Sequence, residues 1–193
     1  MGQYYRIGFK NKGKIFVNSL KVKDDGYQLA KLMEHSYLNT EIMDAVANFL
    51  YMNPTNLLWC GDYVEDEDVK KKTFGSLGYE DLWGDGTPSD GVTPFVFEKC
   101  DNFKYGGKFL INHDKRQYVS FDKVLGENHV SWSEHNIISP ISLLTALGNG
   151  LGCGDYNGEN SELVGSWVWD TIEINDTIPS DYDELDARFT EQK

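Results

Sequence analysis

Residues 3–22, QYYRIGFKNKGKIFVNSLKV, carry the pattern that decides the fold of this chain. Aromatic and β-branched side chains lie on both sides of a four-residue connection, NKGK, at 11–14. Asparagine and glycine adopt the backbone angles of tight turns, whereas aromatic and β-branched residues favour strands. The stretch therefore predicts a β-hairpin, the first pair of strands in an antiparallel sheet.

Helices and further strands follow in an irregular order. Residues 39–54, NTEIMDAVANFLYMNP, predict a helix with Asn39 or Thr40 as its N-cap and Pro54 at its end. Residues 139–148 predict a second helix, and the mixed stretch 26–38 could form a short third one. Apolar runs predict strands at 56–64, 95–100, 106–115, 117–125 and 166–174.

These elements define the expected fold class. The helices are too few and too irregularly spaced for a parallel, doubly wound sheet. We therefore expect an α+β fold, a single domain with a mainly antiparallel sheet and two or three packed helices. The domain is expected to span residues 1–174, with a long acidic and glycine-rich excursion at about 64–94, and residues 175–193 to form an acidic C-terminal tail.

The negative charge of the chain is concentrated in two stretches. The net charge is −13, and residues 58–101 carry −7 of it and residues 155–193 carry −9, while the remainder is slightly positive. Such a surface repels nucleic acids and anionic lipids and attracts basic proteins or cations. We therefore expect no direct binding of nucleic acid and no membrane binding.

Apolar runs and cysteines indicate the compartment. No stretch approaches the roughly 18 uninterrupted apolar residues of a membrane span, and the N-terminus has no apolar run typical of an export signal. An odd number of cysteines, Cys60, Cys100 and Cys153, is typical of reduced thiols. The sequence therefore predicts a cytoplasmic protein.

The tetrapeptide CGDY occurs twice, at 60–63 and at 153–156. The surrounding residues do not align, which argues against a duplicated domain. In one interpretation the two segments meet in a ligand pocket, with Asp62 and Asp155 as its polar groups and Tyr63 and Tyr156 as its walls. In the other, each segment is a structural corner, where the carboxylate binds backbone amides and the tyrosine covers the edge of the core.

Cofactor and catalytic motifs are absent from the sequence. The glycines at 148–158 follow a predicted helix and precede a predicted strand, the reverse of a dinucleotide-binding loop. The three cysteines and the histidines lack the spacing of a zinc site, which leaves metal binding open; the histidines are His35, His113, His129 and His135. We assign no catalytic residue and no cofactor from the sequence.

Acidic runs provide the candidate residues for binding a partner. The expected acidic positions are Glu65, Asp66, Glu67, Asp68, Asp85, Asp181, Asp183, Glu184 and Asp186. Trp83 lies among acidic residues in EDLWGDG and is expected to be exposed, as an aromatic anchor for an interface would be. Carboxylates on such a surface can replace phosphates against lysine and arginine.

Several strings resemble small, uncharacterised proteins of phages and mobile elements of Gram-positive bacteria (Firmicutes). They are MGQYY at the start, LMEHSY at 32–37, WCGDY, LLTALGNG at 143–150, and GDYNGEN followed by VGSWVWDTI at 164–172. The resemblance extends from Met1 to about Ile174. It implies a phage-type accessory protein in the host cytoplasm, and small acidic phage proteins resemble inhibitors of host defence such as anti-CRISPR proteins.

Three functions follow as alternatives. The first is inhibition of a basic, nucleic-acid-handling host protein, such as a CRISPR effector, by an acidic surface that mimics nucleic acid. The second is a small-ligand-binding or hydrolytic enzyme with its pocket at the two CGDY segments. The third is a soluble accessory protein whose acidity serves only its solubility.

Overall fold

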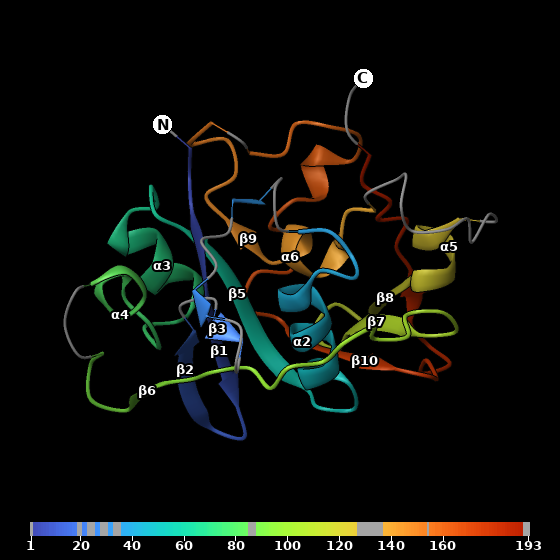
Figure 1. Cartoon of the computed structure of the whole chain (residues 1–193), viewed down its shortest axis with the longest axis horizontal. Helices are drawn as coiled ribbons and strands as arrows, with labels where there is room; N and C mark the ends of the chain where they lie inside the picture. The colour runs from blue at the N-terminus through green and yellow to red at the C-terminus, as the bar shows by residue number, and fades with distance from the viewer. Residues whose placement is uncertain are drawn as a thin grey trace.

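The computed structural model describes residues 2–18, 31–32, 36–84, 88–126, 137–153 and 155–190, together with the backbone alone at 21–22 and 26–27. The fold is a mixed sheet with helices packed against it (Figure 1). His35, Asp85, His129 and His135, which the sequence singled out, lie outside the described residues. Among the described residues, no helix has the length and apolar character needed to cross a lipid bilayer.

The main sheet has the strand order β11-β8-β7-β10-β5-β1-β2-β6, and β9 pairs with β5 beside this path. Its strands are β1 (Tyr5–Asn11), β2 (Lys14–Asn18), β5 (Thr55–Gly61), β6 (Val92–Pro94), β7 (Phe109–Asn112), β8 (Gln117–Ser120), β9 (Ala146–Leu147), β10 (Thr171–Asn175) and β11 (Asp183–Glu184). A separate pair joins β3 (Lys21–Val22) to β4 (Gly26–Tyr27). The α+β class is confirmed.

Pairing is antiparallel along the strand order from β8 to β2, and it is parallel at both ends of that order and where β9 joins the central strand β5. The predicted hairpin is β1–β2, in which Asn11 pairs with Lys14. Lys12 and Gly13 form its turn, both with positive φ (47° and 77°), as the tight turns that suit twisted strands require. The parallel pairs are β2–β6, β5–β9 and β8–β11, all of two or three residues.

Five α-helices lie within the described residues, more than the two or three predicted. The predicted pair is present as α2 (Glu41–Leu50) and α6 (Pro140–Leu144), with Thr40 and Ser139 as the side chains that cap them. The acidic excursion contains α3 (Asp66–Lys72) and α4 (Tyr79–Trp83). The fifth is α5 (Phe121–Leu125), and a short 3-10 helix spans Ser161–Leu163.

Three of the predicted strands were wrong in whole or in part. Residues 117–125 divide into β8 and α5, since the chain turns into a helix after Ser120. Residues 95–100 lie outside the strands of the sheet, and Phe95 and Phe97 pack into an aromatic cluster around Phe9. Residues 166–170 are turns before β10.

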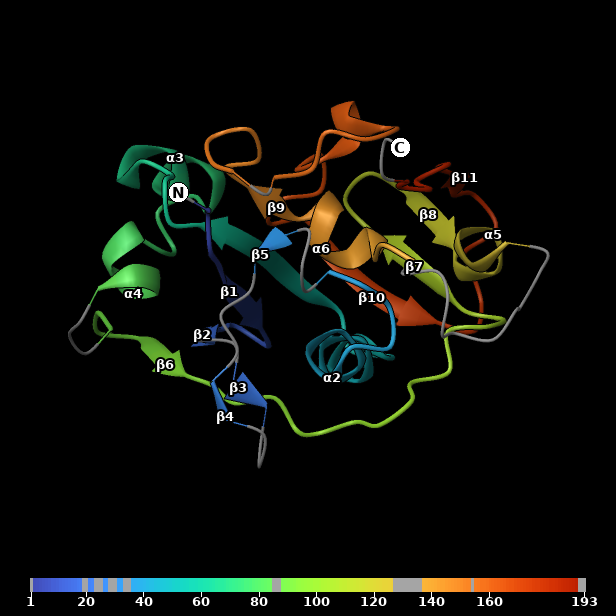
Figure 2. The ribbon, with the colours of Figure 1, turned by 45° about the horizontal axis from the view of Figure 1, so that its top comes forward.

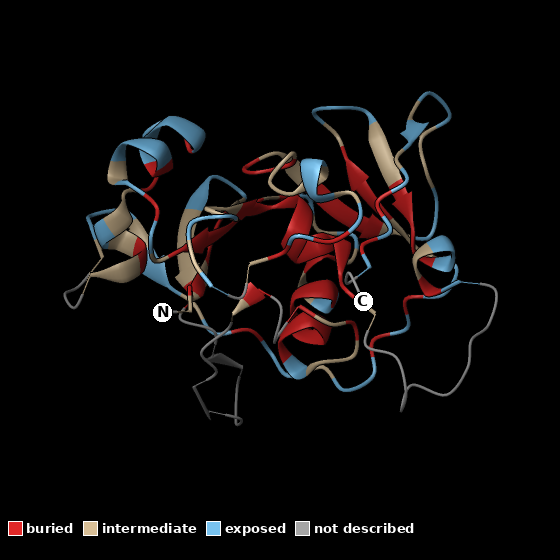
Figure 3. Cartoon of the chain, turned by 90° about the horizontal axis from the view of Figure 1, so that it is seen from above, coloured by how far each residue is buried: buried red, intermediate tan, exposed pale blue. Residues whose placement is uncertain are grey.

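The sheet separates two hydrophobic cores. Leu57 and Trp59 of β5 belong to the larger core beneath α2 and α6, whereas Leu58 and Cys60 belong to the smaller core beneath α3 and α4. This division follows from the alternation of side chains along a strand. Figure 3 shows buried residues concentrated in the sheet and on the inner sides of the helices.

The C-terminal segment belongs to the same packed unit. Residues 175–190 do not form a separate tail, because β11 pairs with β8 and the side chains of Ala187 and Phe189 are buried in the larger core. The Tyr156 hydroxyl accepts a hydrogen bond from the amide of Thr190 at 3.0 Å. Residues 175–190 contain few apolar side chains and are held in place by these contacts with the rest of the domain.

Candidate functional site

The two CGDY segments lie on either side of the start of β1. The amide of Tyr4 donates to Asp62 Oδ1 at 3.1 Å, and the amide of Asp62 donates to the Tyr4 carbonyl at 2.9 Å. On the other side, the amide of Gln3 donates to the Cys153 carbonyl at 3.2 Å. The repeated tetrapeptide therefore marks two segments that meet in space at residues 3–5.

Asp155 is the most fully bonded carboxylate of this junction. It accepts from the amides of Gly150 and Gly152, at 2.7 and 2.9 Å, and from the Tyr5 hydroxyl at 3.1 Å. The Gln3 amide is oriented so that its oxygen faces donors and its nitrogen faces acceptors. In this orientation its nitrogen also donates to both oxygens of Asp155, at 3.1 and 2.9 Å. Burial, followed by the charge of Asp155, raises the pKa of Tyr5 far above its usual value.

The space between the two segments is filled by Gln3, whose side chain is buried. A Cβ added at Gly61 would lie 1.9 Å from the terminal amide of Gln3, and one at Gly152 would lie 2.6 Å from Gln3 Cβ. Asp62 and Asp155 bind backbone amides, and Tyr156 is 3% exposed. The contacts of Asp62, Asp155 and Tyr156 are those of structural corners, whereas Tyr63 is 38% exposed and does not cover the core. The side chain of Gln3 fills the space between the two segments.

The three thiols differ in environment and form no disulfide. Cys60 is buried, and burial raises its pKa to about 12. Cys100 is half-buried, with its pKa also raised by burial, and Cys153 is exposed. Among the described residues, no group of three or more His, Cys, Asp or Glu side chains is placed to hold a metal ion.

A cleft of about 380 Å³ lies between α3, α4 and the loop before β6. Among the described residues, four carboxylates and one lysine line it: Asp66, Glu80, Asp81, Asp90 and Lys70. Asp66 and Asp81 also hold the cleft together, because Asp66 accepts from the Tyr79 amide at 2.8 Å and Asp81 accepts from the Ser89 amide at 2.9 Å.

Charge is ordered along α3. Asp66 and the exposed Glu67 and Asp68 occupy its first turn and three lysines its last, the arrangement that the helix dipole favours. Lys70 Nζ lies 2.5 Å from Asp66, and this contact lowers the pKa of the Asp66 carboxyl. Glu65 precedes the helix and is also exposed.

Trp83 is not the exposed anchor that the sequence predicted. It is the last residue of α4, is half-buried, and packs against the smaller core. The Arg6 guanidinium lies over its ring, 4.6 Å from the centroid, and donates to the Leu82 carbonyl. Trp83 is half-buried because the short helix α4 packs its side chain toward the sheet.

The C-terminal acidic residues lie at the other end of the sheet. Asp183 and Glu184 form β11 beside β8, whereas α3 packs on α4, which contacts β1 and β2 (Figure 2). Most of these C-terminal carboxylates have internal cationic partners: Asp181 pairs with Arg116, Glu184 with Lys123 at 2.6 Å, and Asp186 with Arg188 at 2.6 Å. The two acidic stretches therefore do not combine into one face.

Two polar arrangements were not found from the sequence. Asp44 lies on the buried side of α2 and accepts from the Phe103 amide and the Tyr105 hydroxyl, at 3.1 and 2.9 Å; burial raises its pKa. His113 contacts both Glu173 and Tyr182. The partners of this histidine are 60 and 69 residues away in the sequence, and no local motif connects them to it.

Comparison with known proteins gives no relative: no protein-family model, no curated protein sequence and no solved structure matches this chain.

Proposed function

We propose that this chain is a binding protein that engages a basic partner protein at the cleft between α3 and α4. The observation that carries the proposal is the lining of the cleft, where four carboxylates stand against one lysine among the residues that the structure describes. Glu67 and Asp68 extend the same charge onto the exposed side of α3. A lysine- or arginine-rich segment seated there would exchange water for carboxylate partners and would associate faster at low salt.

The proposal concerns the α3–α4 end of the molecule alone. Most of the C-terminal carboxylates, namely Asp181, Glu184 and Asp186, are engaged with arginine and lysine side chains of the chain itself, so they offer less free charge to a partner. The resemblance to phage proteins favours a nucleic-acid-handling host protein, such as a CRISPR effector, as the partner. In that case the cleft carboxylates stand in for the phosphates that the basic channel of the partner normally binds.

The test compares two variants with the same change in net charge. Glu80→Gln/Asp90→Asn removes two carboxylates that line the cleft, and Glu162→Gln/Asp183→Asn removes two exposed carboxylates elsewhere. Binding of a ten-residue oligolysine peptide is measured by fluorescence anisotropy over a series of salt concentrations. We expect the cleft variant to bind roughly three- to tenfold more weakly than the wild type, and the control to change little. Equal weakening of both variants, or affinity independent of salt, would contradict the proposal.

A second measurement addresses the partner class. Purified CRISPR effector from a Gram-positive bacterium is incubated with labelled target DNA and increasing amounts of the chain. Loss of DNA binding with the wild type, and a weaker effect of the cleft variant, would support an inhibitor of this class. Unchanged DNA binding, alongside intact oligolysine binding, would leave the cleft as a basic-protein site and remove the CRISPR effector as its partner.

A further inference from the structure

The turn after β7 is held by the C-terminal part of the chain at each of its four residues, 113–116. His113 contacts Glu173 and Tyr182, and the Asp114 carboxylate accepts from the Thr171 amide at 2.6 Å. The next two residues form ion pairs, Lys115 with Asp170 at 3.3 Å and Arg116 with Asp181. So many contacts on one short turn fix the position of His113 before any ligand arrives.

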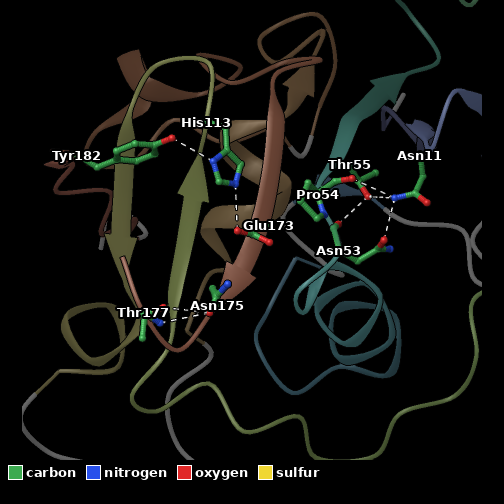
Figure 4. A network of polar contacts seen from close by, with 9 residues as sticks. All are labelled: Asn11, Asn53, Pro54, Thr55, His113, Glu173, Asn175, Thr177 and Tyr182. Atoms are coloured by element: carbon green, nitrogen blue, oxygen red, sulfur yellow. Dashed lines mark hydrogen bonds and ion pairs between the residues drawn. The ribbon is translucent and has the colours of Figure 1, made fainter. Parts of the chain in front are cut away.

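His113 lies between a buried carboxylate and a phenol (Figure 4). Its Nε2 is 3.1 Å from Glu173 Oε1, and its Nδ1 is 3.1 Å from the Tyr182 hydroxyl. The Glu173 side chain is 11% exposed and that of His113 is 29% exposed, so solvent reaches the histidine but scarcely the carboxylate. The rings of His113 and Tyr182 meet edge to face, with centroids 5.9 Å apart.

The backbone on both sides of the network is fixed. The His113 amide donates to the Thr171 carbonyl at 2.9 Å, and the Asp183 amide donates to the Arg116 carbonyl at 2.9 Å. Glu173 lies in β10 between Ile172 and Ile174, which face the larger core, so its side chain points to the other face of the sheet. The three polar side chains meet on that face.

We propose that Glu173, His113 and Tyr182 form a catalytic relay for acyl transfer, with Tyr182 as the nucleophile. Tyr182 takes the place of the nucleophile, His113 is the base within hydrogen-bond reach of it, and Glu173 is the buried carboxylate that orients the base. Glu173 accepts from Nε2–H and thereby leaves Nδ1 free to accept the phenolic proton. Glu173 is a positioning residue, because it acts on Tyr182 only through His113.

The step is a transfer of an acyl group from an ester to the phenol. The Tyr182 oxygen forms a bond to the acyl carbon while its proton passes to His113 Nδ1. The bond from that carbon to the alkoxy or aryloxy oxygen then breaks, and the proton on His113 passes to the departing oxygen. Water hydrolyses the tyrosyl ester and returns the phenol, with the carboxylic acid as the second product.

The surrounding charge selects the class of substrate. Asp170 and Asp181 lie on the segments beside the network, and Lys115 and Arg116 are already paired with them. No free cation of this turn is thus available to a phosphate, and the acidic chain as a whole repels one. An uncharged carboxylic ester needs no cationic partner and is not repelled by the negative charge of the chain. This activity goes beyond the proposed binding function and is independent of it, because the network and the α3–α4 cleft lie on different parts of the sheet.

The test uses p-nitrophenyl acetate as the acyl donor, and mass spectrometry of peptides locates the acetyl group and its rate of appearance. In the wild type we expect Tyr182 to be acetylated on the order of 100-fold faster than Tyr63, which is 38% exposed and has no such base beside it in the described structure. His113→Asn should reduce the Tyr182 rate to that of Tyr63. Equal rates at the two tyrosines in the wild type, or acetyl on His113 instead of Tyr182, would overturn the proposal.

The role of Glu173 needs a separate readout, because its loss could simply loosen the turn. Glu173→Gln keeps an acceptor for Nε2–H and removes the negative charge, and circular dichroism melting checks that the variant is folded. We expect Tyr182 acetylation to slow on the order of tenfold in Glu173→Gln and to recover in part in Glu173→Asp, which restores the carboxylate. An unchanged rate in folded Glu173→Gln would leave the network with a structural role alone and would overturn the relay.

Discussion

The Tyr5 hydroxyl donates a hydrogen bond to the Asp155 carboxylate at 3.1 Å, across 150 residues of sequence. It joins the first strand of the sheet to the second CGDY segment. Gln3, two residues earlier, fills the space between that segment and Gly61 of the first CGDY segment. The junction between the start of β1 and the two CGDY segments therefore depends on a few polar contacts at the edge of the core.

The Tyr5–Asp155 hydrogen bond predicts a loss of stability in Tyr5→Phe. The substitution removes one donor from a half-buried carboxylate that retains the amides of Gly150 and Gly152. We expect the free energy of unfolding to fall by about 1–2 kcal/mol. The measurement is urea unfolding followed by tryptophan fluorescence, with Tyr63→Phe, at an exposed position, as the control that should change by less than about 0.5 kcal/mol. Equal losses of unfolding free energy in the two variants would show that this hydrogen bond does not contribute to stability.

The close approach of Gly61 and Gln3 predicts coupled effects. Gly61→Ala would place a methyl group against the buried Gln3 amide and should cost about 1–3 kcal/mol. Gln3→Ala alone should also destabilise, because Asp155 loses a donor. In the double variant the space is open, so Gly61→Ala should cost little in the Gln3→Ala background.

Urea unfolding of the two single variants and the double variant gives the coupling energy, which should be on the order of 1–2 kcal/mol. Gly106→Ala is the matched control, since its added Cβ would meet its nearest neighbour, the Asp122 carboxylate, at 3.7 Å, an ordinary contact. Additive losses at Gly61 and Gln3 would mean that the backbone moves to absorb the methyl group.

Local patterns were sufficient to predict the centre of this fold. The hairpin around Lys12 and Gly13 follows from turn chemistry, and α2 follows from its cap at Thr40 and its apolar stripe. The junction at Gln3, Tyr5 and Asp155 could not be predicted in the same way. Its members are adjacent only because distant strands pair, and the repeated CGDY indicated only that two segments have similar local chemistry.

Elements that depend on docking were missed or misplaced. In α3, the sequence DEDVKKK has acidic residues first and basic residues last, which suits a helix, but its solvated composition fits a loop equally well. Trp167 and Trp169 are two residues apart, a spacing that would place both on one face of a strand, but Trp169 has a φ of 63° and the two rings enter different cores. The burial of Phe189 is a tertiary effect for which the acidic segment around it gave no local sign.

Phe9 and Phe74 predict opposite outcomes for the same substitution. Phe9 is fully buried and contacts the rings of Phe16, Phe49, Phe95 and Phe97 at centroid distances of 5.0–5.8 Å. Phe9→Ala should lower the free energy of unfolding by about 3–5 kcal/mol. Phe74 is 90% exposed with a φ of 52°, and Phe74→Gly should be neutral or slightly stabilising, because glycine adopts positive φ without strain. Thermal and urea unfolding of both variants measure these changes in stability. A large loss of unfolding free energy in Phe74→Gly would show that the Phe74 ring makes a stabilising contact.

The three thiols should react with iodoacetamide in a fixed order. Cys153 is exposed and should be alkylated first, followed by the half-buried Cys100. Cys60 should react at least about 100-fold more slowly than Cys153, since burial blocks access and raises its pKa to about 12, which removes the reactive thiolate. Mass spectrometry of peptides at a series of times gives the three rates. Comparable rates in denaturant are the control, and fast labelling of Cys60 in the folded protein would contradict its burial.

Asp176 predicts a defined dependence of stability on pH. It accepts from Lys108 Nζ at 2.6 Å and from the Tyr51 hydroxyl, and these bonds, the lysine first, lower its pKa in the folded protein. Because the pKa is lower in the folded protein, the ionised carboxylate stabilises the fold. This contribution is fully present above the ordinary pKa of aspartate, about 3.9, and is lost as the pH falls through the folded-state pKa.

Asp176→Asn should therefore be less stable than the wild type at pH 7, and the difference should shrink between roughly pH 4 and pH 2 as the wild-type carboxyl takes up its proton. Urea unfolding of both proteins across this range measures the difference, with added salt expected to reduce it because the carboxylate is exposed. Asp90→Asn, which makes the same change in net charge at the cleft, is the control for general electrostatics. A difference that stays constant down to pH 2 would assign the loss to the shape of the asparagine side chain instead of to the charge of Asp176.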